Sequence, residues 1–153
     1  KRDDIRFLIV GQGELLDPMQ DQVMKNGYEK SVIFTGPRKD ISRILSISDI
    51  FLALSNIENI WSTTIIEAMI LEVPCIITKA GYTEKVLKHK KNCYMVEKEN
   101  PKDLAKTIEL LLAQSDARDY IASNAKHFIT VEKGYQKDII LKKYMNIYNQ
   151  LVS

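Results

Sequence analysis

The sequence predicts an α/β fold with a doubly wound parallel sheet, helices on both faces and further helices closing the chain. Short apolar runs typical of buried strands alternate with segments of helical periodicity up to residue 96. One strand–helix–strand unit fits into about 30 residues, and such a unit requires parallel neighbouring strands. Only helical patterns follow residue 100. These observations are typical of the Rossmann-like class.

Length and composition are those of one compact domain. The chain has 153 residues, of which 45% are hydrophobic and 27% charged, so a sizeable core can form. The net charge of +2 is too small to favour nucleic acid as a partner. No apolar run approaches the roughly 18 residues of a membrane span. We therefore expect a cytoplasmic protein with a single domain over residues 1–153.

The cysteines and histidines give no sign of a metal or redox centre. Cys75 and Cys93 lie in apolar, strand-like runs and are expected to be buried free thiols. His89 and His127 stand alone in the sequence, so no cluster of metal ligands is present. We expect neither a metal nor another cofactor.

The first predicted strand, Ile5–Val10, ends at two glycines, Gly11 and Gly13. Glycines at a strand end let the backbone approach a ligand closely. Leu16 stands where the dinucleotide fingerprint requires Gly or Ala, which argues against a nicotinamide site. A plain strand-to-helix turn is the alternative. A helix is predicted from residue 14 to an Asn-Gly pair at residues 26–27.

The second predicted strand, Val32–Phe34, is followed by Gly36 and two basic residues, Arg38 and Lys39. The cations could contact phosphate, or they could be solvated loop residues. A short helix bearing apolar residues at 41, 44 and 45 is expected next.

The centre of the chain is the strand–helix–strand unit. Ile50–Leu54 and Pro74–Thr78 are the two strand-like runs, and Ile65–Leu71 is apolar almost all the way round, as in a buried helix. Proline is tolerated at the first position of the second run.

Hydroxyl residues open the central helix, because Ser62, Thr63 and Thr64 precede its apolar run. Free amides there, at the carboxyl end of a parallel strand, predict a site for phosphate or a nucleotide. Glu67 could accept hydrogen bonds from a vicinal diol such as ribose. Thr64 and Glu67 also have the spacing of a capping box, a purely structural role that can coexist with binding.

Residues 55–76 resemble the signature of the group 1 glycosyltransferases, retaining, nucleotide-sugar-dependent enzymes of the GT-B fold. The run from Glu67 to Met69 and the Val73-Pro74 pair match the family pattern. The family pattern also has an acidic residue eight positions before the glutamate that corresponds to Glu67. Asn59 occupies that position and Glu58 lies one residue further away. Either the loop has an extra residue and Glu58 is the catalytic acid, or Asn59 has replaced it.

The resemblance extends to the loops on either side. It implies that the loop at Phe34–Gly36 lies beside the nucleotide base. It also implies that Gly81, Tyr82 and Glu84 belong to the loop that contacts the diphosphate and donor sugar. Lys79 stands where the family commonly has an acidic or small residue. The following lysines are expected to form a solvated face or, alternatively, to contact anionic lipid: Lys85, Lys88, Lys90 and Lys91.

The last part of the chain completes the predicted fold. Cys93–Val96 is the fifth strand, and Pro101 begins a helix at a position that suits proline. Ser115–Phe128 and Tyr135–Leu151 are two further helices. The apolar and aromatic residues of the last helix are expected to be core or domain-contact residues.

The resemblance implies that the chain is the C-terminal, donor-binding half of a two-domain enzyme. An acceptor domain and the first strand of this domain would precede Lys1, so the fragment is expected to be inactive alone. The complete enzyme would transfer a sugar from a nucleoside diphosphate with retention and without a metal, in polysaccharide or glycoconjugate synthesis. Its expected partners are the nucleotide sugar, its own N-terminal domain and the inner face of a membrane.

Two other functions fit the same pattern. A nucleotide-sugar epimerase would share the fold, and a non-catalytic interaction domain would explain why the first acid is displaced. A receiver-like signalling domain fits less well, because no acidic pair follows the first strand.

Overall fold

The computed structural model describes residues 4–55, 62–80, 82–134 and 137–152. The chain forms two compact units, residues 1–41 and 42–153, and each contains its own parallel sheet. The expectation of one nucleotide-sugar-binding domain over the whole chain stays a prediction.

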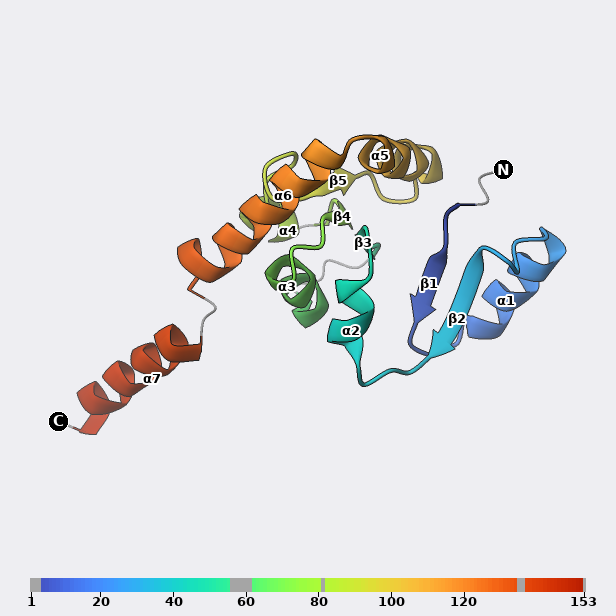
Figure 1. Cartoon of the computed structure of the whole chain (residues 1–153). Helices are drawn as coiled ribbons and strands as arrows, with labels where there is room; N and C mark the ends of the chain where they lie inside the picture. Colours follow the sequence, from blue (N-terminus) through green and yellow to red (C-terminus); the bar gives the residue numbers. More distant parts are fainter. Residues whose placement is uncertain (1–3, 56–61, 81, 135–136, 153) are drawn as a thin grey trace. The chain divides into compact units, whose positions relative to one another are not determined.

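The unit of residues 1–41 is built on two parallel strands. β1 (Phe7–Val10) pairs with β2 (Val32–Gly36), and the register shifts between Ile9 and Val10. α1 (Leu16–Lys25) connects them (Figure 1). The helix ends at Asn26 and Gly27 as predicted, and Gly27 takes the positive φ of 66° that commonly terminates a helix.

The larger unit contains three parallel strands. β3 (Phe51–Ala53), β4 (Cys75–Thr78) and β5 (Tyr94–Val96) lie in that order in the sheet. α2 (Ile41–Ser46) precedes β3, and α4 (Tyr82–Val86) follows β4. All four β4 residues are buried, as the continuous apolar run predicted for a central parallel strand.

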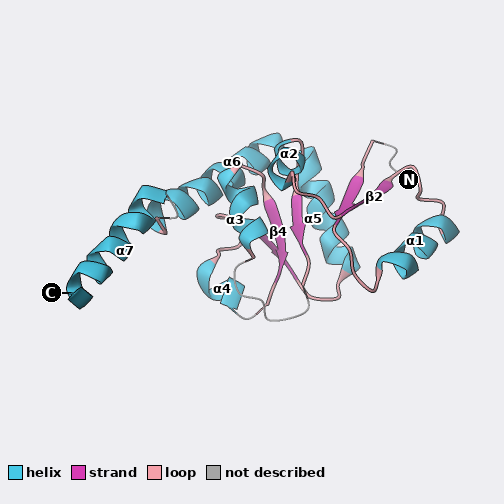
Figure 2. Ribbon diagram, turned by 90° about the horizontal axis from the view of Figure 1, so that it is seen from below, coloured by secondary structure: helices cyan, strands magenta, loops and turns pink. Residues whose placement is uncertain are grey.

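Helices cover both faces of this sheet. α3 (Thr63–Ile70) and α5 (Pro101–Ala113) lie on opposite sides of β4 (Figures 1 and 2). α3 buries Ile65, Ala68 and Met69, but Glu67 and Ile70 are exposed. The prediction that this helix is buried all round is therefore wrong, because only one face packs on the sheet.

The core of the larger unit joins the sheet to α5 and to the following helix. Ile76, Val96 and Leu111 form a fully buried cluster. Burial of each such side chain contributes roughly 1.5–3 kcal/mol. α5 begins as predicted at Pro101, and the side chain of Asn100 caps it by accepting the Asp103 amide at 3.1 Å.

The C-terminal helices match the predicted ranges, with one difference. α6 (Ser115–His127) continues into a π-helical turn, Phe128–Glu132, which the sequence did not predict. α7 (Lys137–Val152) follows.

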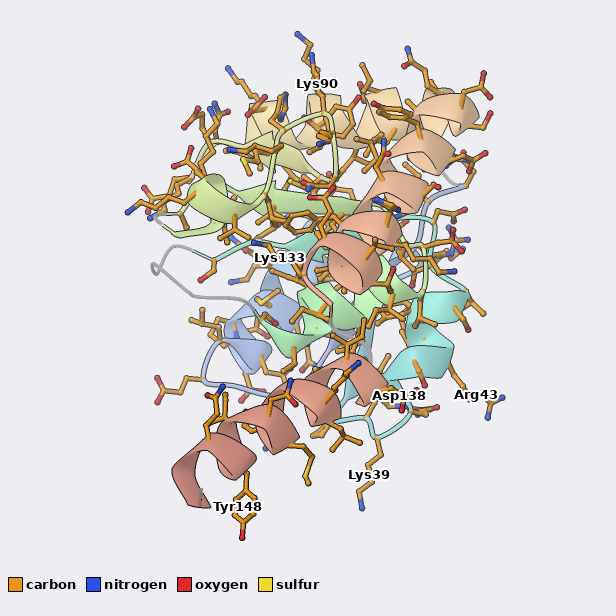
Figure 3. The ribbon with its side chains drawn as sticks, turned by 90° about the vertical axis from the view of Figure 1, so that its left-hand side faces the viewer. Lys39, Arg43, Lys90, Lys133, Asp138 and Tyr148 are labelled. Atoms are coloured by element: carbon orange, nitrogen blue, oxygen red, sulfur yellow. The ribbon has the colours of Figure 1, made fainter. Side chains whose placement is uncertain are left out.

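Most of the described apolar side chains of α7 are exposed. Tyr144 and Tyr148 expose 69% and 60% of their surface, and Figure 3 shows Tyr148 projecting from the helix. A core role for these two tyrosines within this chain is therefore wrong, and a contact with another domain stays a prediction.

The α/β class with parallel strands and surrounding helices is confirmed. Among the described residues, no helix combines the length and the apolar character that crossing a membrane requires.

Candidate functional site

The candidate site is the carboxyl edge of the sheet in the larger unit. Because β3, β4 and β5 are parallel neighbours, their last residues lie along one edge. Ser55, Lys79 and Glu97 follow the three strands in turn, and α3 and α4 begin at Thr63 and Tyr82. Side-chain contacts tie these strand ends together.

The first contact joins the ends of β3 and β4 through one hydroxyl group. Thr78 Oγ1 accepts a hydrogen bond from the Ser55 amide at 3.0 Å and donates one to the Ser55 carbonyl at 2.7 Å. Thr78 is almost fully buried, so its hydroxyl requires such partners. The backbone pairing of β3 with β4 ends at Ala53 and Ile77, and the threonine side chain extends it.

The second contact joins the ends of β4 and β5. The Lys79 amide donates to the Val96 carbonyl at 2.9 Å, and the Lys79 ammonium forms an ion pair with Glu97. The hydrogen bond to Glu97 and its charge raise the pKa of Lys79. Glu97 is held in turn, because its amide donates to the Asp103 carboxylate at 3.1 Å. The Lys79 ammonium is therefore already paired with a carboxylate of the protein, that of Glu97.

The hydroxyl residues at the start of α3 have unequal roles. Ser62 is the N-cap, and its Oγ accepts the Thr64 amide at 3.3 Å. The predicted capping box of Thr64 with Glu67 is wrong, since the helix begins before Thr64. The residue at the capping-box position is instead the apolar Ile65.

Fewer amides are open at this helix end than the sequence predicted. Ser62 Oγ takes the Thr64 amide, and the Ser62 carbonyl takes the amides of Ile65 and Ile66 at 3.0 and 3.3 Å. Within the described ranges, the Thr63 amide has no partner. Partial positive charge at the helix end still favours an anion there.

Glu67 is an exposed carboxylate on α3 itself. It lies three and four residues after Thr64 and Thr63, so all three share one face of α3. No hydrogen bond or ion pair joins its carboxylate to another described residue. The two oxygens of a carboxylate can accept hydrogen bonds from two ligand hydroxyls, which suits a sugar diol.

The predicted donor-sugar loop is only partly described. Gly81 lies outside the described residues, and Tyr82 is described only as the first residue of α4. Glu84 is exposed in the first turn of that helix. Thr83 fixes the turn, because its Oγ1 donates to the Ala80 carbonyl at 2.7 Å.

The two candidates for the catalytic acid, Glu58 and Asn59, also lie outside the described residues. The choice between them stays a prediction. Of the segment between β3 and α3 that contains them, the structure describes the residues on either side, Ser55 and Ser62.

The basic run that begins in the last turn of α4 is exposed. Lys85, Lys88, Lys90 and Lys91 all face solvent, and Figure 3 shows Lys90 pointing outward. The contact with anionic lipid stays a prediction.

His89, within this run, has a structural contact. Its Nδ1 accepts the Met95 amide at 2.9 Å. Burial, followed by the charges of Lys90 and Lys79, lowers the pKa of His89, so the acceptor nitrogen remains unprotonated at neutral pH.

The two thiols are buried and free, as predicted. Burial raises the pKa of Cys93 to about 12, and that of Cys75 further, so neither is a nucleophile at neutral pH. Within the described ranges, no group of three or more His, Cys, Asp and Glu residues could hold a metal ion.

The unit of residues 1–41 has its own carboxyl edge. Gly11, after β1, donates its amide to the Gly36 carbonyl at 2.9 Å. Their φ angles are +124° and +67°, which L side chains rarely adopt. A Cβ on either would meet nothing within 4 Å, so backbone conformation rather than crowding requires glycine. Gly13 does not have a positive φ, and a Cβ there would also meet nothing within 4 Å, so neither conformation nor crowding requires glycine at this position.

Arg38 is paired within its own loop. Its Nε and Nη2 donate to the two carboxylate oxygens of Asp40 at 2.8 and 2.7 Å, and this bond raises the pKa of Arg38. The predicted phosphate contact would require the guanidinium to share or leave Asp40.

The sequence did not single out Thr78 or the Lys79–Glu97 pair. A threonine as the last residue of a buried apolar strand was the available signal for Thr78, because a buried hydroxyl needs partners.

Comparison with known proteins covers most of the chain. The sequence model described as "Glycosyl transferases group 1" matches residues 1–128. The N-acetyl-alpha-D-glucosaminyl L-malate synthase of Bacillus anthracis is 27% identical over 145 residues, which are 95% of this chain and 37% of that protein. An uncharacterized glycosyltransferase of Methanocaldococcus jannaschii is 26% identical over 149 residues, 97% of this chain and 38% of that protein. The chain thus spans less than two fifths of these relatives' lengths.

Two solved structures share the fold. Anabaena HepE in complex with UDP and glucose has a TM-score of 0.83 at 21% identity, covering 97% of this chain and 41% of that one. The C-terminal domain of a group 1 glycosyl transferase, LpcC, from Francisella tularensis has a TM-score of 0.76 at 26% identity. It covers 89% of this chain and 73% of that one.

Proposed function

The chain belongs to the group 1 glycosyltransferases, and from this premise we propose that it is the donor-binding part of an enzyme that uses a nucleoside diphosphate sugar. The observation that carries the proposal is Glu67, which is exposed on the face of α3 that Thr63 and Thr64 share and has no hydrogen bond or ion pair to another described residue. Glu67 would accept hydrogen bonds from ribose hydroxyls, and the helix end would attract the diphosphate.

The proposed reaction is transfer of a sugar to an acceptor with retention at the anomeric carbon. The diphosphate is the leaving group, so catalysis consists of positioning the donor and stabilising the departing negative charge. The dipole of α3 contributes to that stabilisation without a metal. Glu58 or Asn59 would accept from donor-sugar hydroxyls, and Gly81, Tyr82 and Glu84 would line the donor loop.

The acceptor would bind to another part of a longer polypeptide. This proposal is supported by the lengths of the relatives, of which the chain spans 37% and 38%. A cytoplasmic location at the inner face of a membrane, with exposed lysines against anionic lipid, belongs to the same proposal.

Uridine diphosphate is the first nucleotide to test, because structures of HepE and of the S. aureus enzyme TarM contain UDP. The experiment is an NMR titration of the 153-residue chain with UDP, GDP, the two monophosphates and inorganic phosphate. Shifts of the Thr63 and Glu67 amides that are larger for one diphosphate than for its monophosphate are the expected result. Equal shifts with inorganic phosphate would indicate an anion site without nucleotide recognition, and would contradict the proposal.

A further inference from the structure

We propose that His89 is a pH-sensitive latch, which holds the edge strand β5 in place only while its imidazole is neutral. This inference goes beyond the proposed function and does not depend on it. β5 lies at an edge of its sheet, because the strand order in the larger unit is β3-β4-β5. His89 belongs to the connection from α4 to β5, and its Nδ1 accepts the amide of Met95, the central residue of β5, at 2.9 Å.

The Met95 amide points away from the neighbouring strand. The next residue, Val96, faces β4, because its carbonyl accepts the Lys79 amide at 2.9 Å. Successive residues of a strand turn their backbone groups to opposite sides, so Met95 directs its amide to the outer edge of β5, where strands present unpaired N–H groups. Only 7% of Met95 is exposed. Water is therefore a poor replacement for the imidazole that satisfies this amide.

The imidazole of His89 is held in its orientation by neighbouring residues. The ring packs edge-on against Tyr94, with the ring centroids 5.5 Å apart and the planes at 74°. The turn that carries His89 is closed by Asn92, whose Oδ1 accepts the Lys88 amide at 2.8 Å. Asn92 is almost fully buried, so the turn is anchored to the body of the unit. The bond to Met95 is therefore a built contact of this turn.

Protonation of His89 is incompatible with this contact. A neutral imidazole has one nitrogen that accepts a hydrogen bond, whereas both nitrogens of an imidazolium donate. A charged His89 therefore sets one N–H group against another, and the Met95 amide loses its acceptor. Part of the His89 side chain faces solvent, so protons reach the ring without unfolding of the chain.

Charged groups from three parts of the chain act on the ring. Partial burial lowers the pKa of His89 from its ordinary value of 6.5, and the charges of Lys90 in the same turn and Lys79 after β4 lower it further. Asp103 on α5 acts in the opposite direction. The folded chain thus favours the neutral ring. The stability that this preference contributes is present above pH 6.5 and is lost as the pH falls through the lowered pKa of His89.

Release of Met95 is expected to reach the candidate site through the two residues that follow it. The Val96 carbonyl accepts the Lys79 amide, and Glu97 pairs with the Lys79 ammonium. The end of β5 therefore holds the residue that follows β4. Loosening of β5 at low pH should weaken this part of the carboxyl edge.

The test compares the 153-residue chain with three variants at a temperature where all are folded. His89→Asn puts an amide oxygen close to the place of Nδ1 and does not titrate, whereas His89→Leu removes the acceptor. His127→Asn is the matched control, because His127 is an exposed histidine at the end of α6. The ring titration of His89 is followed by NMR. Protection factors of the Met95 and Lys79 amides, which are corrected for intrinsic exchange, are measured at about pH 7.5 and about pH 5, across the range where histidine titrates.

We expect the protection of the wild-type Met95 amide to fall about fivefold between the two pH values, as for the loss of one hydrogen bond, and that of the Lys79 amide to fall with it. His89→Asn should keep the Met95 protection high at both pH values, and His89→Leu should keep it low at both. His127→Asn should behave as the wild type. A fall of equal size in His89→Asn would mean that other groups cause it and would overturn the latch. A fall at Met95 with none at Lys79 would overturn the connection to the site.

Discussion

The two sheet edges of this molecule are held in different ways. At the ends of β1 and β2, the Gly11 amide bonds the Gly36 carbonyl, and both residues have positive φ. At the ends of β3 and β4, the hydroxyl of Thr78 holds the backbone of Ser55. The first edge depends on backbone conformations that L side chains rarely adopt, whereas the second depends on one buried side-chain hydroxyl. The first edge should therefore respond to the addition of a side chain, and the second to the loss of a hydroxyl group.

The largest effect is expected at the glycine edge. Gly11→Ala forces a side chain onto a φ of +124° and should lower the free energy of unfolding of its unit by about 1–3 kcal/mol. Gly13→Ala is the control, because Gly13 has no positive φ and open space around it. It should be neutral or stabilising by up to about 1 kcal/mol. The free energy of unfolding of both variants is measured by urea unfolding, followed through the amide signals of β1 and β2. If the two variants lost equal stability, the positive φ of Gly11 would not be the reason for its effect.

The next effect concerns the start of α3. Ser62→Ala should cost about 1 kcal/mol in the free energy of unfolding, because Ser62 Oγ caps the Thr64 amide. Thr64→Ala should cost less, since Thr64 lies inside the helix, where alanine is favoured. Thermal and urea unfolding of the two variants distinguish these roles. If Thr64→Ala lowered the free energy of unfolding more than Ser62→Ala, the result would support the capping box of Thr64 with Glu67 and contradict the capping role of Ser62.

The smallest effect is expected for the ion pair at the ends of β4 and β5. Lys79 and Glu97 are both well exposed, so screening by water limits their contribution. Lys79→Met should lower the melting temperature slightly at low salt and not at high salt. Lys106→Met, at another exposed lysine, is the control and should show no such dependence. A loss that persists in high salt would mean that the lysine stem rather than its charge stabilises this edge.

Much of the fold was predictable because its signals are local. The apolar run of β4, the Asn26-Gly27 helix end and the Pro101 helix start each depend on residues that are close in sequence. The alternation of such segments predicted parallel strands, and the structure confirms it.

What the sequence did not predict depends on distant or competing contacts. Three consecutive hydroxyl residues could each cap α3, and only the backbone conformation selects Ser62. Thr78 meets Ser55 across 23 residues, and that pairing requires the register of two strands. The location of the site, at the end of the central strand, was therefore predictable from the sequence. The contacts between its residues were not.

The measurement that tests the central claim most directly is the Kd for UDP of two glutamate variants. Glu67→Gln removes the charge from the α3 carboxylate. Glu109→Gln does the same to an exposed glutamate on α5 that has no hydrogen bond or ion pair to another residue in the described part of the chain. Loss of one charge-assisted hydrogen bond should weaken binding at least tenfold for Glu67→Gln, with no change for Glu109→Gln. Equal Kd values for both variants and the wild type would contradict a nucleotide site at Glu67.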